Sequence, residues 1–224
     1  MSQHVTFAAT SGDASGEMVE PALPARAAGV VLVQEWWGLN DHIRSLATRL
    51  AADGFVVLAV DLYHGKVAKD ATTAGEMMQA LDKKNAIEEI RGAVQFLRKH
   101  ARCNGHVGVV GFCMGGALTF AAACNIPEVG AAVPFYGIPD ASLVDYNKVR
   151  APILAHFAGR DAWAKPEGAK AIQTQLAARG QAMELHVYDA DHAFVNDTRP
   201  EVYSPDNAKL AWDRTVKFFH AHLG

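Results

Sequence analysis

The stretch Gly-Phe-Cys-Met-Gly-Gly at residues 111–116 decides how this chain is interpreted. It follows the apolar run His106–Val110, which predicts a buried strand, and it opens an alanine-rich run that predicts a helix. Glycines two positions before and after Cys113 suit a sharp strand-to-helix turn with little room for side chains. Such a turn lifts the thiol above the sheet, to a helix N-terminus whose unpaired N–H groups and dipole favour a thiolate. We therefore predict that Cys113 is a nucleophile.

Two alternative interpretations of this turn stay open. Cysteine is often buried for packing alone, so Cys113 could be a small structural residue in a glycine-rich turn. A phosphate-binding turn also joins a strand to a helix through glycines, but neither Gly-x-Gly-x-x-Gly nor Gly-x-x-x-x-Gly-Lys-Ser/Thr is present. Because the strand and helix patterns fit on both sides of Cys113, we favour the nucleophile.

Strand and helix patterns alternate along the rest of the chain. Apolar runs typical of buried parallel strands are Gly29–Gln34, Phe55–Val60, His106–Val110, Ala131–Phe135, Ile153–Phe157 and Glu184–Tyr188. Helical spacing of apolar residues predicts helices from Leu39 to Leu50, from Ile87 to Leu97 and after Ser204–Pro205, and the glycine- and serine-rich segment Ser11–Gly16 predicts a hairpin turn. Repeated strand–helix units predict an α/β fold, a single domain over residues 1–224 whose twisted, mostly parallel sheet carries helices on both faces.

Composition and cysteine usage exclude several classes of protein. The 224 residues are 50% hydrophobic and 20% charged with a net charge of −3, which is typical of a globular protein and argues against nucleic-acid binding. No window approaches about 18 consecutive apolar residues, so we expect no membrane span. The three cysteines lack Cys-x-x-Cys and zinc spacings, and residues 1–7 lack a signal-peptide pattern. We expect free thiols, a cytoplasmic location and no metal site.

A base and an orienting acid for Cys113 are predicted from two later loops. Ligands bind at the carboxyl ends of strands in such sheets, and Asp161 and His192 each follow a predicted strand closely. Nucleophile, acid and histidine then occur in the chain order typical of α/β-hydrolases. Asp189 and Asp191 are rival candidates for the acid, and we interpret them as residues that shape the loop. Other histidines, such as His64, His100 and His156, are interpreted as structural or surface residues.

Five motifs together resemble the dienelactone hydrolase (carboxymethylenebutenolidase) family of the α/β-hydrolase superfamily. They are Gln-Glu-Trp-Trp-Gly-Leu at 34–39, Asp-Leu-Tyr-His-Gly at 61–65, the stretch at 111–116, Gly-Arg-Asp at 159–161 and His-Ala-Phe at 192–194. The resemblance runs from about Val5 to the last predicted helix. It implies a monomeric, single-domain enzyme that hydrolyses an enol-lactone without a cofactor or metal. It assigns the nucleophile to Cys113, the acid to Asp161 and the base to His192.

Glu35 stands at the end of an apolar strand, where a carboxylate costs free energy unless it is paired. An ion pair with Arg44 is one interpretation. The resemblance implies another, in which Glu35 helps to convert the thiol into a thiolate when substrate binds. The oxyanion would then be held by the backbone N–H groups of Trp36 and Met114. Trp36 and Trp37 either line the substrate pocket or pack in the core.

One departure from the family concerns arginines. The resemblance implies that arginines hold a substrate carboxylate, one before the nucleophile strand and one soon after the histidine, but Ala71–Ala86 contains no arginine and Arg199 is the nearest after His192. Arg199 is therefore the candidate for substrate binding. The small-molecule substrate is then an enol-lactone, or another lactone or ester. The alternatives are a broader carboxylesterase or thioesterase on the same triad, and a non-hydrolytic thiol sensor or ligand-binding module.

Overall fold

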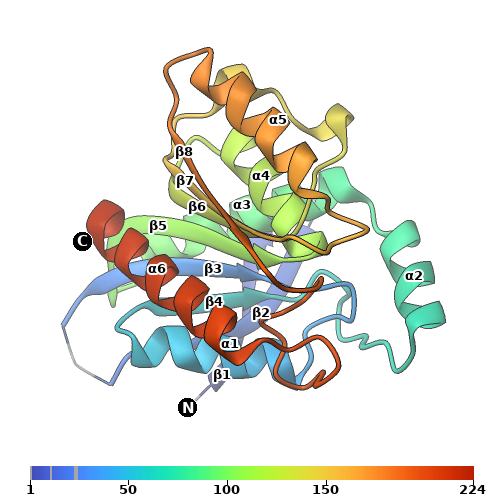
Figure 1. The fold of residues 1–224 in the computed structure, drawn as a ribbon. Helices are drawn as coiled ribbons and strands as arrows, with labels where there is room; N and C mark the ends of the chain where they lie inside the picture. Colours follow the sequence, from blue (N-terminus) through green and yellow to red (C-terminus); the bar gives the residue numbers. More distant parts are fainter. Residues whose placement is uncertain (1, 11, 23–24) are drawn as a thin grey trace.

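The computed structural model describes residues 2–10, 12–22 and 25–224, and within them an eight-stranded sheet carries helices on both faces (Figure 1). The strands are β1 (Ser2–Ala9), β2 (Gly12–Val19), β3 (Ala27–Val33), β4 (Val56–Val60), β5 (Cys103–Phe112), β6 (Val129–Phe135), β7 (Ile153–Ala158) and β8 (Met183–Tyr188). The helices are α1 (Asp41–Ala52), α2 (Ala71–Ala80), α3 (Lys83–Lys99), α4 (Met114–Asn125), α5 (Pro166–Ala177) and α6 (Pro205–Leu223), and two 3-10 turns, Ala141–Leu143 and Tyr146–Lys148, follow β6. Each predicted strand and helix is present, with ends shifted by a few residues.

The strand order is β1-β2-β4-β3-β5-β6-β7-β8. Strands β3 to β8 are parallel, while β2 pairs antiparallel with both β1 and β4. The predicted α/β fold with a mostly parallel sheet is therefore confirmed. Because parallel strands end at the same edge, the loops after β3, β5, β7 and β8 meet there.

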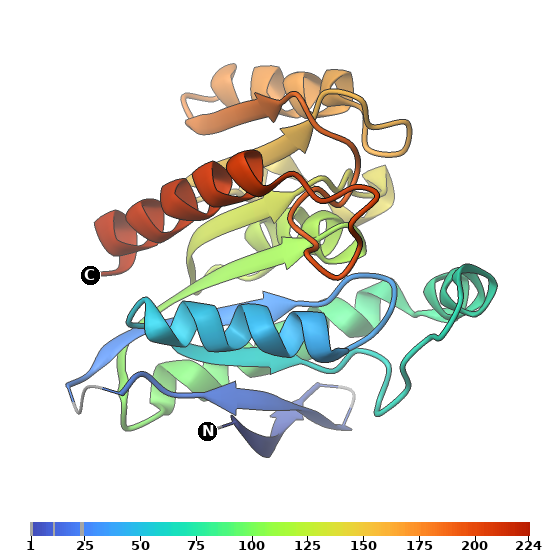
Figure 2. The same ribbon diagram turned by 60° about the horizontal axis from the view of Figure 1, so that its bottom comes forward.

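The two faces of the sheet are covered by different helices, which is why the central strands are apolar throughout. In β3, Val30 and Leu32 pack in a core cluster with α1 and α6, whereas Val31 and Val33 pack in a second cluster with α3, α4 and α5. Figure 2 shows α1 and α6 together in front of the sheet. Helix α2 stands away from the sheet (Figure 1), and Ala74 is its buried residue. None of the described helices has both the length and the apolar character needed to cross a bilayer.

The prediction of a hairpin turn over Ser11–Gly16 is wrong for most of that segment. Ser11 lies outside the described residues, and Gly12–Gly16 belongs to β2. A Cβ on Gly16 would lie 2.3 Å from the carbonyl oxygen of Ala59 in β4, so glycine permits the close pairing of the two strands. Gly16, one of the small residues that suggested a turn, is thus required by the packing of a strand.

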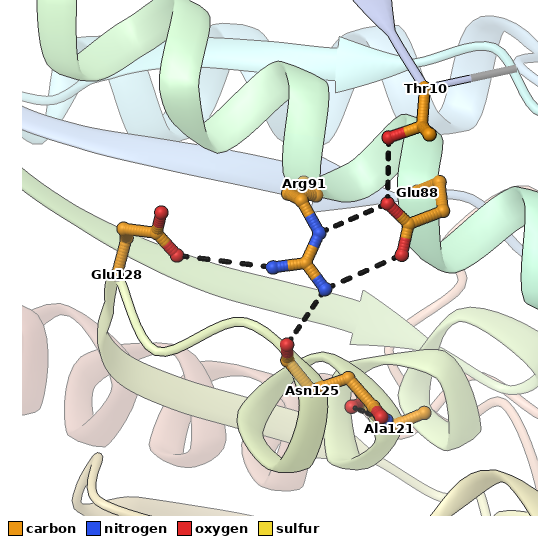
Figure 3. Close-up of polar contacts among 6 residues, drawn as sticks. All are labelled: Thr10, Glu88, Arg91, Ala121, Asn125 and Glu128. Atoms are coloured by element: carbon orange, nitrogen blue, oxygen red, sulfur yellow. Dashed lines mark hydrogen bonds and ion pairs between the residues drawn. The ribbon is translucent and has the colours of Figure 1, made fainter.

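A polar network joins α3 to the end of α4 (Figure 3). Arg91 in α3 donates to both carboxylate oxygens of Glu88, at 3.1 and 3.3 Å, and to the carbonyl oxygen of Asn125 at 2.7 Å. Glu88 also accepts from Thr10 at 2.9 Å, and Glu128 lies 4.0 Å from Arg91. The Arg91 side chain therefore satisfies a carbonyl group that the end of α4 leaves without a helical partner.

Candidate active site

Cys113 lies between β5 and α4 with a backbone φ of 56° and ψ of −115°. A positive φ is strained for a residue with a side chain, and such strain is typical of functional sites. The conformation is held by hydrogen bonds from Cys113 N to the Phe135 carbonyl oxygen (3.1 Å) and from Ala117 N to the Cys113 carbonyl oxygen (3.1 Å). The thiol is half-buried, whereas Cys103 and Cys124 are buried, and all three cysteines are free.

The glycines on either side of Cys113 are required by close backbone contacts. A Cβ on Gly111 would lie 2.2 Å from the Gly115 carbonyl oxygen, and a Cβ on Gly115 would lie 2.4 Å from the Val33 carbonyl oxygen. The first glycine therefore permits the sharp turn, and the second permits α4 to approach β3. Both glycines have the steric role predicted from the sequence.

Asp161 and His192 are hydrogen-bonded at the same edge of the sheet, after β7 and β8. His192 Nδ1 donates to Asp161 Oδ2 at 2.6 Å, while Asp161 Oδ1 accepts the N–H groups of Trp163 (2.8 Å) and Ala164 (2.9 Å). Burial by itself would raise the pKa of Asp161, but the hydrogen bond from His192 and those from the backbone hold it below its usual value. Asp161 therefore stays a carboxylate that fixes the orientation of His192.

The other side of His192 faces Cys113. Burial lowers the pKa of His192, but hydrogen bonds with Asp161 and Cys113 outweigh it and raise the pKa to about 10. The rival carboxylates have another partner, because Asp189 and Asp191 form ion pairs with Arg160. The structure thus pairs His192 with Asp161, as predicted from the sequence, and not with either rival.

Glu35 is 1% exposed at the end of β3, and its environment differs from the predicted ion pair. Its Oε2 accepts a hydrogen bond from Asn196 Nδ2 at 2.9 Å, and its Oε1 has no hydrogen-bond partner among the described residues. Burial raises the pKa of Glu35, while electrostatic interactions with His42, His192 and Arg199 and the hydrogen bond from Asn196 act in the opposite direction. The alternative pairing with Arg44 is wrong.

Arg44 instead forms ion pairs with Asp41 at 3.2 Å and with Glu17 at 3.9 Å. Asn196 is a residue that the sequence reasoning missed. It lies 161 positions from Glu35, and no spacing along the chain indicates such a contact.

Aromatic side chains surround the site. The rings of Trp36 and Trp37 are 5.1 Å apart, and Trp36 also lies 6.2 Å from Trp163, which is 77% exposed. Tyr136 packs edge-on against His192 at 5.1 Å, and its hydroxyl group is buried. Trp163 and Tyr136 were not predicted from the sequence, although each lies close to a predicted feature. Trp163 stands two residues after Asp161, and Tyr136 directly follows the predicted strand Ala131–Phe135.

Two cavities adjoin Cys113, one of about 260 Å³ and one of about 460 Å³. Met114, the first residue of α4, lines the smaller cavity. Trp36, Trp37, Arg199 and Glu35 line the larger one. All the residues predicted for the site, other than Asp161, thus border space next to Cys113 or His192. No group of three histidine, cysteine or carboxylate side chains in the described ranges is arranged to hold a metal ion.

This sheet order, with Cys113 in the turn after β5 and a hydrogen-bonded Asp161–His192 pair in the loops after β7 and β8, is that of an α/β-hydrolase fold. The model of the dienelactone hydrolase family matches residues 15–223, and the chain belongs to that family.

Similarity to known sequences and to a solved structure supports this assignment. "Protein usf" of Aquifex pyrophilus is 35% identical over 206 residues, which cover 87% of this chain and 88% of that protein. A protein of Aquifex aeolicus named "Putative carboxymethylenebutenolidase" is 31% identical over 232 residues, covering 100% of both chains. A solved dienelactone hydrolase-like promiscuous phosphotriesterase from metagenomic libraries has the same fold, with a TM-score of 0.89 at 22% identity, covering 100% of this chain and 99% of that one.

Proposed function

We propose that this chain hydrolyses a lactone or an activated ester through a Cys113–His192–Asp161 triad and a thioester intermediate. The observation that carries the proposal is the position of His192, which bonds Asp161 on one side and faces Cys113 on the other. Family membership supports the same class of reaction, since carboxymethylenebutenolide is itself a lactone.

The first half of the reaction transfers the acyl group to sulfur. With a pKa of about 10, His192 carries a proton at neutral pH, and an imidazolium beside Cys113 favours the thiolate form. The Cys113 sulfur attacks the carbonyl carbon, and the N–H groups of Trp36 and Met114 hold the negative oxygen. The C–O bond then breaks, and the leaving oxygen takes the proton from His192.

The second half returns the enzyme to its starting state. Neutral His192, oriented by Asp161, removes a proton from water as the water oxygen attacks the thioester carbonyl carbon. The C–S bond breaks, so the acid is released and Cys113 leaves as a thiolate beside protonated His192. An enolate leaving group is stabilised, which suits a thiol nucleophile, and amides should be poor substrates.

Glu35 has a supporting role in this proposal. Its buried side chain lines the larger cavity, as Cys113 does, and one of its carboxylate oxygens has no hydrogen-bond partner among the described residues and can accept a proton. Its pKa, raised by burial, makes it a better proton acceptor than an exposed glutamate. Glu35 would therefore help to keep the thiol ionised when substrate displaces water from the cavity.

The loss of dienelactone ultraviolet absorbance tests the proposal, with a Cys113→Ala variant and a simple aryl ester as comparisons. Fast loss with the wild type alone, together with a thioester adduct on Cys113 detected by mass spectrometry, is the expected result. Hydrolysis of the aryl ester alone would favour the broader carboxylesterase or thioesterase. If neither substrate reacts faster than with the variant, the hydrolase proposal fails and the thiol sensor gains support.

A specific observation favours the broader esterase as the second candidate. The Ala71–Ala86 segment that contains α2 has no arginine, and Arg199 Nε donates to Glu201 at 2.8 Å, so its guanidinium is already partly engaged. A substrate carboxylate is therefore not needed for binding in this proposal. A single domain, a monomer and a cytoplasmic location remain predictions, and size-exclusion chromatography with light scattering tests the second.

A further inference from the structure

The two cavities at Cys113 share a wall. Met78, Cys113, Trp163 and His192 line both of them, so the reacting groups stand where the cavities meet. Met78 comes from α2, which stands away from the sheet, and Trp163 from the loop after β7. An ester whose carbonyl carbon contacts the Cys113 sulfur can therefore extend into both cavities at once.

The two cavities differ in chemistry. The larger one, about 460 Å³, is lined by the indoles of Trp36, Trp37 and Trp163, flat surfaces that suit a flat conjugated group. Its lining also holds Glu35, Arg199 and the ion pair between Arg160 and Asp191, so its charges are of both signs. The smaller one, about 260 Å³, runs along Ala117 and Leu118 of α4 towards Ile138 and Leu143.

The charged residues that line the smaller cavity do not indicate a charged ligand. Lys83 and Asp140 are both part of its lining, and the charge of Lys83 acts on Asp140. Two opposite charges that interact leave little net charge for a ligand to match. The remaining surface is mainly aliphatic and suits an unbranched hydrocarbon chain.

We propose that Trp163 and Met78 divide the substrate site into two parts. The substrate is then an ester whose flat, unsaturated leaving group lies in the tryptophan-walled cavity and whose aliphatic acyl chain lies in the cavity along α4. This inference rests on the proposed hydrolysis at Cys113. The leaving group is assigned to the tryptophan cavity because a thiol nucleophile needs a stabilised leaving group, and conjugated enolates and phenolates are both stabilised and flat. Trp163 is then a specificity-determining residue.

The acyl chain is tested with 2-naphthyl esters from acetate to octanoate. For the wild type, kcat/KM should rise about tenfold from acetate to hexanoate, because added methylenes are buried along α4. An Ile138→Trp variant, which fills the smaller cavity, should abolish that rise with chain length, so that hexanoate loses far more of its kcat/KM than acetate does. Leu210→Trp is the matched control, since Leu210 is exposed on α6 and lines neither cavity. The proposal would be overturned if kcat/KM of the wild type did not change with chain length, or if Ile138→Trp lowered kcat/KM equally for all the esters.

The leaving-group cavity is tested with Trp163→Ala and Trp163→Phe. The alanine variant should raise KM for 2-naphthyl acetate about tenfold with a smaller change in kcat. KM for 2,2,2-trifluoroethyl acetate, whose leaving group is stabilised but not flat, should rise much less, and the phenylalanine variant should restore most of the loss. Equal losses on both esters would indicate a merely structural Trp163 and contradict the proposal.

A binding measurement separates this inference from the proposed reaction. The ketone 2-naphthyl pentyl ketone cannot be hydrolysed, so its affinity for the Cys113→Ala variant is measured by quenching of indole fluorescence. Binding that weakens about tenfold when Ile138→Trp or Trp163→Ala is added supports the divided site, even if Cys113 proves not to be the nucleophile. Affinity unchanged by both substitutions overturns the divided site, even if Cys113→Ala abolishes hydrolysis.

Discussion

At the scale of single residues, the two oxygens of Asp161 have separate partners. Oδ2 accepts from His192, and Oδ1 accepts from the backbone of Trp163 and Ala164. An Asp161→Asn variant must present an NH₂ group to one of these donors, so His192 loses its orientation or takes the wrong tautomer. We expect kcat to fall by about 10³-fold or more while the fold persists.

Steady-state kinetics with circular dichroism measures this effect, and Asp189→Asn is the matched control. Asp189 pairs with Arg160 and should be replaceable with little change in kcat. A similar, small loss in both variants would show that Asp161 does not orient the base.

Replacing Glu35 should raise the free energy of unfolding at alkaline pH but lower kcat. A group whose pKa is raised by folding contributes stability that is fully present below its unfolded pKa, here 4.5, and is lost as the pH rises through the folded value. The Glu35→Gln variant has no carboxyl proton to lose. It should match the wild type in stability near pH 4.5 and exceed it by roughly 1–3 kcal/mol near pH 8, while its kcat falls.

Urea unfolding at several pH values measures the difference. Glu167→Gln, at an exposed position in α5, should show no such dependence on pH. A Glu35→Gln variant that is less stable than the wild type at pH 8 would mean that the carboxylate is stabilised in the fold.

The catalytic candidates differ in how far the sequence could identify them. Cys113, Asp161 and His192 each lie within four residues of the end of a strand. Strands of a parallel sheet bring such positions to one edge wherever they lie in the chain. The Asn196 contact to Glu35 and the Tyr136 contact to His192 depend on loop conformation. No periodicity in the sequence encodes those conformations.

At the scale of elements, the position of α4 depends on both of its ends. Cys113 begins it, and the Arg91 side chain holds its last carbonyl group, on Asn125 (Figure 3). An Arg91→Ala variant removes that bond and the two bonds to Glu88, so we expect a loss of about 1–3 kcal/mol in the free energy of unfolding. Denaturant titration measures it.

Arg98→Ala is the matched control on the same helix. Arg98 is exposed and donates a single bond of 3.3 Å to the Gly105 carbonyl oxygen, so its loss should cost less than about 0.5 kcal/mol. Equal stabilities of the two variants would show that the network in Figure 3 contributes nothing beyond a surface contact.

Elements were predictable where their hydrophobic pattern was continuous. Strands β3 and β4 are buried on both faces and read as unbroken apolar runs, and α3 shows a clear apolar stripe. The hairpin strand β2 was mistaken for a turn because its inward positions are held by Ala14 and Gly16. Gly16 permits a close contact with β4, which only the assembled sheet creates.

At the scale of the whole molecule, two histidines change the free energy of unfolding with pH in opposite directions. His156 is fully buried between Tyr188 and Thr215, and burial lowers its pKa well below 6.5, with the charges of His186 and Arg214 adding to the effect. It takes up a proton on unfolding, so stability should fall as the pH drops below about 6.5. His192 has the opposite shift, with a pKa of about 10. Its contribution is fully present below about 6.5 and is lost as the pH rises towards 10.

The free energy of unfolding should therefore be greatest near pH 6.5, with each limb no steeper than about 1.4 kcal/mol per pH unit for each proton. Glu35, whose pKa is also raised from 4.5, loses its contribution as the pH rises above that value and so moves the maximum to lower pH. Urea titrations from pH 5 to 9 measure the profile. A His192→Gln variant should flatten the alkaline limb, and the control His4→Gln, on the exposed side of β1, should not. A wild type whose stability rises steadily from pH 7 to 9 would mean that folded His192 holds no extra proton, and the imidazolium beside Cys113 would then have to form only when substrate binds.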